Sequence, residues 1–154
     1  MSRTVRGRLL GIDHGTKVIG LAICDALWIA ARPFEVLRRK SRVDDFARIN
    51  AIIARQQIAA IVVGLPEQPA DAATASETQA ILVRQWAKRL AKAVNVPVYL
   101  WPEQFSTFEA ELLSAEAGSR ATGRIDDRAA AVILQSFIDA HRDDGPLPAP
   151  IRSA

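Results

Sequence analysis

Three carboxylates occur where the sequence passes between apolar and polar segments. Asp13 follows the apolar run at 9–12, Glu103 follows the run at 97–101, and Asp126 precedes an apolar segment of helical periodicity. Taken singly, each has an ordinary structural alternative: a turn former, an exposed loop acid and a helix N-cap, respectively. Taken together, they are candidates for shared chemistry.

Carboxylates that converge repel one another and lose hydration, so their convergence is costly unless a cation neutralises them. Mg²⁺ or Mn²⁺ takes oxygen ligands and keeps open positions for water and phosphate oxygens. Two such ions about 3.5–4 Å apart can stabilise both sides of an in-line phosphoryl displacement. If Asp13, Glu103 and Asp126 meet, we expect them to be both catalytic residues and ligands of one or two metal ions.

The beginning of the chain predicts three antiparallel strands. Apolar runs at 9–12 and 18–24 flank a bend in which Gly15 permits a tight reversal. A third strand over 27–37, interrupted near Pro33, suits an edge position. This arrangement places Asp13 at the bend of the first hairpin.

The remainder of the chain alternates helix and strand. We expect buried strands over 58–63 and 97–101, and helices over 42–57, from a capping box at Thr74 to Asn95, from a capping box at Ser106 to Gly118, and from Asp126 onward. The result is an α/β fold with a five-stranded mixed sheet, three antiparallel strands then parallel βαβ units, and helices on both faces. Ligands bind such sheets at the carboxyl ends of the strands, where Asp13 and Glu103 fall, and helical periodicity turns Asp126 towards the sheet.

Composition predicts a single domain over 1–143 and a proline-rich tail at 144–154 that we expect to be poorly ordered. No apolar run approaches the roughly 20 residues of a membrane span, and the start lacks a signal peptide. The single Cys24 has no disulfide partner, which favours a reducing cytoplasm. The net charge of +3 permits a polyanionic partner. Its basic clusters are either phosphate contacts or solvated surfaces.

Four motifs resemble those of the YqgF/RuvX family, in order and spacing, across residues 8–140. They are LGIDHGTK with IGLA at 10–22, IVVGLP at 61–66, Glu103 with Ser106-Thr107, and Ile125-Asp126 with Ala129-Ala130. That family is described as Holliday junction resolvases and as the nuclease that matures the 5′ end of the 16S ribosomal RNA precursor, on an RNase H-like fold. The resemblance implies a metal-dependent endonuclease with the acidic triad Asp13, Glu103 and Asp126.

The sequence departs from the family pattern beside these motifs. Pro102 and Gln104 flank Glu103, where the family usually has an aspartate and an arginine, and Val18 occupies a position often held by arginine. Residues 67–71 replace a polar, glycine-containing continuation. Replacing arginine by glutamine removes a guanidinium that binds phosphate bidentately. An alternative is therefore a nucleic-acid-binding member of the fold with weakened catalysis.

The hypothesis from sequence is hydrolysis of phosphodiester bonds with Mg²⁺ or Mn²⁺, most specifically in maturation of the 16S ribosomal RNA precursor. Structured RNA, branched DNA and ribosomal particles are the expected partners, and both monomer and homodimer stay open. His14 either contacts the substrate or only shapes the site. Nucleotide binding of the actin and sugar-kinase type is a further alternative, although those proteins close two such domains around ATP. We expect phosphate contacts from basic residues beside the acids: Lys17, Arg120, Arg124 and Arg128.

Overall fold

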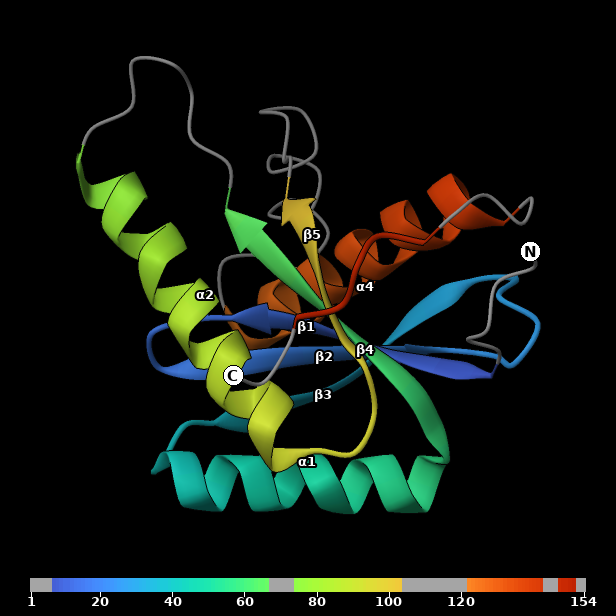
Figure 1. Ribbon diagram of the computed structural model, residues 1–154, viewed down its shortest axis with the longest axis horizontal. Coiled ribbons are helices and arrows are strands. Elements are labelled where there is room, and N and C mark those ends of the chain that lie inside the picture. The colour runs from blue at the N-terminus through green and yellow to red at the C-terminus, as the bar shows by residue number, and fades with distance from the viewer. Residues whose placement is uncertain (1–6, 67–73, 104–121, 143–146, 152–154) are drawn as a thin grey trace.

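The computed structural model describes residues 7–66, 74–103, 122–142 and 147–151, with the backbone alone at 74–78 and 122–127. Its centre is a five-stranded sheet of order β3-β2-β1-β4-β5 (Figure 1). Strands β1, β2 and β3 pair antiparallel, whereas β4 pairs parallel with β1 and β5 pairs parallel with β4. The predicted mixed sheet is therefore confirmed. Its strands are β1 (Arg8–His14), β2 (Val18–Cys24), β3 (Ala31–Arg38), β4 (Ile58–Pro66) and β5 (Val98–Glu103).

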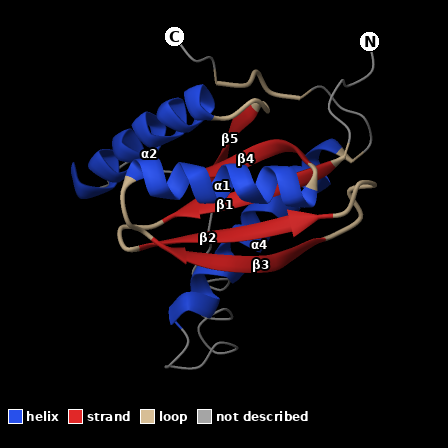
Figure 2. Cartoon of the chain, turned by 90° about the horizontal axis from the view of Figure 1, so that it is seen from below, coloured by secondary structure: helices blue, strands red, loops and turns tan. Residues whose placement is uncertain are grey.

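Helices cover both faces of this sheet, as predicted. The described part of the chain contains α1 (Arg42–Gln56), α2 (Thr74–Ala93) and α4 (Thr122–His141). One apolar core joins the sheet to α1 and α2, and a second core joins its other face to α4. Figure 2 shows α1 and α4 on opposite sides of the strands. Within the described ranges, no helix combines the length and apolar character needed to cross a bilayer.

Two glycines place α4 unusually close to the sheet. A Cβ added to Gly11 would lie 2.8 Å from Leu134 Cβ and 3.1 Å from the Ala130 carbonyl oxygen. A Cβ added to Gly64 would lie 2.4 Å from Ile133 Cδ1. Since side chains alternate along a strand, Asp13 projects from β1 on the same face as Gly11. The first predicted acid thus faces α4.

Helix α4 begins earlier than predicted, at Thr122 rather than near Asp126. Asp126 consequently lies inside the helix, which excludes the N-cap role that the sequence had left open. One helical turn separates it from Ala130, which packs on β1. The beginning of α4 therefore approaches the carboxyl end of β1.

The third strand also begins later than predicted, because residues 27–30 lie in a turn and an irregular segment before β3. Asp25 Oδ1 accepts a hydrogen bond from the Ile29 amide at 2.7 Å. Trp28 has a φ of 60° and donates from Nε1 to the Gly7 carbonyl at 2.8 Å. The predicted edge position of β3 is confirmed, with Pro33 inside the strand beside a shift of register.

Residues 147–151, which belong to the predicted tail, pack against the domain. The Ile151 amide donates to the Val98 carbonyl at 2.8 Å. Ile151 packs against the core beneath α1 and α2, whereas Leu147 packs against the core beneath α4. Such contacts would oppose the entropy of a short segment in which proline already restricts the backbone, and the predicted disorder of the tail stays a prediction. The predicted loop 67–73, the side chains of the Thr74 capping box, and the helix predicted from Ser106 lie outside the described residues.

Candidate functional site

The structure brings two of the three predicted acids together at one end of the sheet. Asp13 follows the β1 residue that pairs with Val63, and Glu103 pairs with Pro66 as the last residue of β5. Glu103 therefore ends its strand rather than following it. Both residues project towards α4 from strands that flank β4, and the Asp13 and Glu103 side chains share a hydrogen bond.

The electrostatics of this pair favour retention of a proton. Burial raises the pKa of Glu103 above its ordinary value, and the hydrogen bond with Asp13 partly opposes that rise. Two carboxyl groups can share a hydrogen bond only when one is protonated. A divalent cation could replace this proton, because two adjacent oxygen donors of negative charge form a hard-ligand set. The donor chemistry of Asp13 and Glu103 thus fits Mg²⁺ or Mn²⁺.

The third predicted acid is placed only through its backbone. Asp126 lies on α4 at the helical repeat of Ala130, which faces β1. Its side chain lies outside the described atoms, so its meeting with Asp13 and Glu103 stays a prediction. Among the side chains that the structure describes, no group of three histidine, cysteine or acidic residues is placed to hold a metal ion.

The predicted phosphate contacts are described to different extents. Lys17 is exposed in the turn between β1 and β2, and Arg128 is half-buried on α4. Arg124 is placed only through the backbone of α4, and Arg120 lies outside the described residues. Their roles therefore stay predictions.

Arg39, which the sequence did not single out, holds the turn that carries Lys17. Its guanidinium Nη1 donates to the carbonyls of Gly15 at 3.0 Å and Thr16 at 3.3 Å, and its amide donates to the Lys17 carbonyl at 2.9 Å. No spacing in the sequence links Arg39 to this turn, because the contact depends on the pairing of β2 with β3. Arg39 therefore positions the exposed end of the first hairpin.

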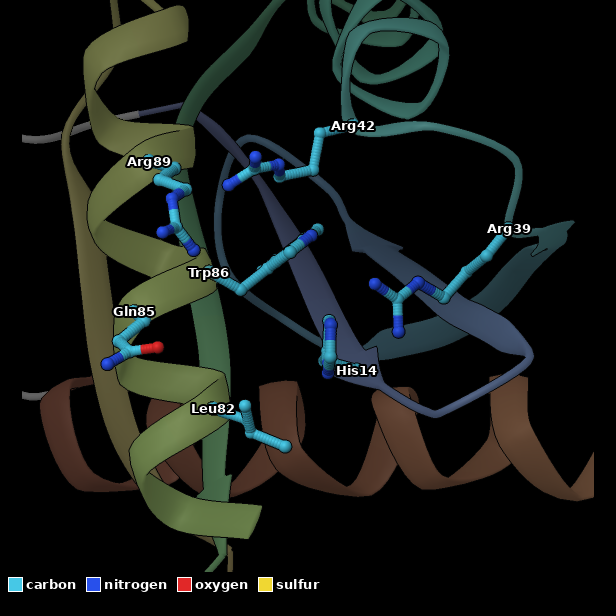
Figure 3. A pocket seen from close by; sticks show the side chains of 7 residues that line it. All are labelled: His14, Arg39, Arg42, Leu82, Gln85, Trp86 and Arg89. Atoms are coloured by element: carbon cyan, nitrogen blue, oxygen red, sulfur yellow. The ribbon is translucent and has the colours of Figure 1, made fainter. Parts of the chain in front are cut away.

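A pocket opens on the other face of the sheet, immediately behind Asp13. It has a volume of about 410 Å³, and its lining includes His14, Trp86 and three arginines (Figure 3). Burial, and then the positive charge of Arg39, lower the pKa of His14 to about 4, so its imidazole is neutral at pH 7. Trp86 is buried, as expected of a core tryptophan, and its ring centroid lies 4.6 Å from that of His14. The sequence did not predict this pocket.

Comparisons with known proteins agree on one group of relatives. A family model described as "RuvX: Holliday junction resolvase" matches residues 7–140. A protein of Zymomonas mobilis named "Putative pre-16S rRNA nuclease" is 41% identical over 138 residues, which cover 88% of this chain and 82% of that protein. A protein of Anaeromyxobacter with the same name is 43% identical over 135 residues, covering 86% and 96% of the two chains.

A solved structure shows the same fold. It is described as "T. thermophilus RuvC in complex with Holliday junction substrate". The structural match covers 94% of this chain and 99% of the RuvC chain. The TM-score is 0.56 and the sequence identity is 20%. The predicted RNase H-like architecture is therefore confirmed.

Proposed function

Because the chain belongs to the RuvX family, we propose that it is a nuclease that hydrolyses phosphodiester bonds with the help of a divalent metal ion. The observation that carries this proposal is the hydrogen-bonded pair of Asp13 and Glu103 at the carboxyl ends of β1 and β5. A half-buried acid pair that shares a proton is unfavourable for stability, and it becomes useful where a cation is to be bound.

The residues that would hold the metal are Asp13 and Glu103, with Asp126 as the third. A bound Mg²⁺ or Mn²⁺ supplies Lewis-acid chemistry, activating water and stabilising the leaving oxygen. The chain supplies the orientation: hydrogen bonding along β4 and β5 fixes Glu103, and the pairing of β1 with β2 fixes Asp13. Lys17 and Arg128 are the described basic residues that we assign to the substrate phosphates, together with Arg124 and Arg120.

We assign the 5′-end maturation of the 16S ribosomal RNA precursor as the reaction, with contact to ribosomal particles in the cytoplasm. The support is the name shared by relatives that are 41% and 43% identical over most of this chain. Branched DNA is the competing substrate, supported by the description of the family model.

A cleavage assay with purified protein tests the chemistry. We expect the full chain to cut precursor RNA only when Mg²⁺ or Mn²⁺ is added, and Asp13→Asn to abolish the cut. Glu35→Gln, which neutralises an exposed acid on β3, is the matched control and should cut like the wild type. RNA binding without cleavage at any metal concentration would instead identify a binding module, and metal-independent cleavage would exclude the proposed site.

A depletion strain tests the physiological substrate. Unprocessed 16S precursor should accumulate when the protein is depleted, and wild-type protein but not Asp13→Asn should restore processing. Normal precursor processing together with cleavage of four-way DNA junctions by the purified protein would assign the DNA substrate instead.

A further inference from the structure

The pocket behind Asp13 is rich in hydrogen-bond donors and positive charge. We name it the arginine pocket, after Arg39, Arg42 and Arg89 in its lining. These side chains approach it from the residue after β3, the start of α1 and the carboxyl-terminal part of α2 (Figure 3). None of the described residues that line the pocket is acidic. Its chemistry therefore suits an anionic ligand that only accepts hydrogen bonds.

Two of the three guanidinium groups are available to such a ligand. Arg42 and Arg89 are exposed, and neither makes a hydrogen bond or an ion pair with any residue that the structure describes. Among the described acids, Asp45 is the one whose charge acts on His14, and it is already paired with Arg48 at 2.9 Å. The positive charge of the pocket is thus not neutralised by these neighbours.

The floor of the pocket contains polar atoms that lack partners. His14 is 9% exposed and Trp86 is 3% exposed. Neither ring nitrogen of His14, nor Nε1 of Trp86, has a hydrogen-bond partner among the described residues. Unpaired buried donors are costly in a folded protein, and a phosphate oxygen would satisfy an N–H of either ring.

The surroundings favour a nucleic-acid strand over a small anion. Lys88 and Lys92 are exposed on α2, each three residues beyond a pocket residue, Gln85 and Arg89 respectively. Leu82 adds a half-exposed apolar side chain to the lining. A volume of about 410 Å³ exceeds the needs of a lone phosphate and accommodates part of an attached nucleotide. Basic residues that continue beyond the pocket can follow a phosphate backbone.

We propose that the arginine pocket binds a phosphate of the nucleic-acid strand at a point away from the scissile bond, on the face of the sheet opposite Asp13. Asp13 and His14 are consecutive in β1 and project to opposite faces. A strand held in the pocket would therefore pass around the carboxyl end of β1 to reach the acid pair. The identity of the ligand as nucleic acid rests on the proposed function, whereas the site itself rests on the contacts described above.

The three tryptophans provide a direct binding assay in the wild-type chain. Trp28 Nε1 donates to the Gly7 carbonyl and Trp101 Nε1 donates to Ser136 Oγ, so only the Trp86 indole N–H is unpartnered among described residues. In ¹H–¹⁵N spectra recorded with EDTA, a single-stranded RNA should shift the Trp86 indole signal and leave the other two in place. Loss of one signal in Trp86→Phe gives the assignment. An unmoved Trp86 signal, or one moved by inorganic phosphate but not by RNA, would overturn the proposal.

Paired substitutions give a second, independent measurement. Arg42→Gln with Arg89→Gln should weaken RNA binding about tenfold and reduce the slope of log Kd against log salt by about 1.4, as expected for two lost phosphate contacts. Arg32→Gln with Arg55→Gln removes the same charge from exposed positions on β3 and in the last turn of α1. This control should change Kd less than about twofold. Equal losses in the two double variants would show a general charge effect and contradict the proposal.

Kinetic measurements distinguish failure of the phosphate-binding pocket from failure of the proposed nuclease activity. If the wild type cuts RNA, the Arg42 and Arg89 double variant should raise KM and leave kcat near the wild-type value, because neither residue contacts the acid pair. If the wild type cuts nothing at any metal concentration, the nuclease proposal fails, and the Trp86 signal and the salt slope still decide whether the pocket binds RNA.

Discussion

Asp13 and Glu103 share a hydrogen bond although strand β4 lies between the strands that carry them. The contact depends on the parallel pairing that brings the carboxyl ends of β1, β4 and β5 to one edge. It also means that the metal-free protein holds two acids in an unfavourable position.

Neutralising Glu103 should abolish cleavage and stabilise the metal-free fold. The raised pKa means that the folded state retains a proton after the unfolded state has lost it, so stability falls as the pH rises above the ordinary pKa of 4.5. Glu103→Gln removes that loss, and its Tm without metal at pH 8 should exceed that of the wild type. Cleavage should fall at least about a thousandfold. A lower Tm in Glu103→Gln than in Glu35→Gln would contradict this account.

Divalent metal should stabilise the wild type and not the variants of the pair. At a free Mg²⁺ or Mn²⁺ concentration of about 100 Kd, the gain is about 2.7 kcal/mol, or roughly 5–10 °C in the Tm of a domain of this size. Differential scanning calorimetry with and without metal measures it, with sodium chloride at matched ionic strength as the control. Equal shifts in the wild type and Asp13→Asn would place the bound metal elsewhere.

Acid should destabilise the protein through His14. The pKa of His14 is lowered to about 4 in the folded state, chiefly by burial, while the unfolded chain takes up a proton near 6.5. The free energy of unfolding contributed by the neutral imidazole is therefore complete above pH 6.5 and is lost as the pH falls towards 4. The loss is less than about 1.4 kcal/mol per pH unit, because the ring borders an open pocket. His14→Phe should flatten this part of the stability profile in urea titrations. An unchanged profile would show that other groups cause the acid limb.

Adding one methyl group at Gly11 should displace α4. The new Cβ of Gly11→Ala would meet Leu134 Cβ and the Ala130 carbonyl, neither of which can rotate away. We expect a destabilisation of about 1–3 kcal/mol, as for other overpacked cores, together with reduced cleavage because Asp126 is carried by the same helix. Chemical denaturation and the RNA assay check the two effects. Wild-type stability in Gly11→Ala would mean that α4 can move away without cost.

Local patterns were sufficient for the order of strands and for the position of Asp13 and Glu103 at strand ends. Periodicity could not place the start of α4, because Gly123 disfavours a helix interior and the acid at 126 resembles an N-cap. Trp28 and Ile29 favour β-strands, but they lie outside β3 because the Asp25 carboxylate accepts a hydrogen bond from the Ile29 amide. Such side-chain competition leaves little trace in hydropathy.

The arginine pocket was beyond sequence reasoning for a different reason. Arg39 precedes α1, Arg42 is the first residue of α1, and Arg89 lies on α2. They meet only because α1 and α2 pack on the same face of the sheet. Each arginine alone resembles a solvated surface residue, so tertiary packing is the step that turns separate charges into a common site.

The hydrogen bond from the Ile151 amide to the Val98 carbonyl affects the tendency of this protein to self-associate. An outermost β-strand offers unpaired amides and carbonyls to any extended peptide, and this is a common route to aggregation. On the β3 side, Pro33 and the charged residues Arg32 and Glu35 discourage such pairing. On the β5 side, the tail pairs with the first residue of the strand, passing from Leu147 on one core to Ile151 on the other. A chain ending before Leu147 would leave the Val98 carbonyl without this partner, and pairing of this edge with another chain would then become easier.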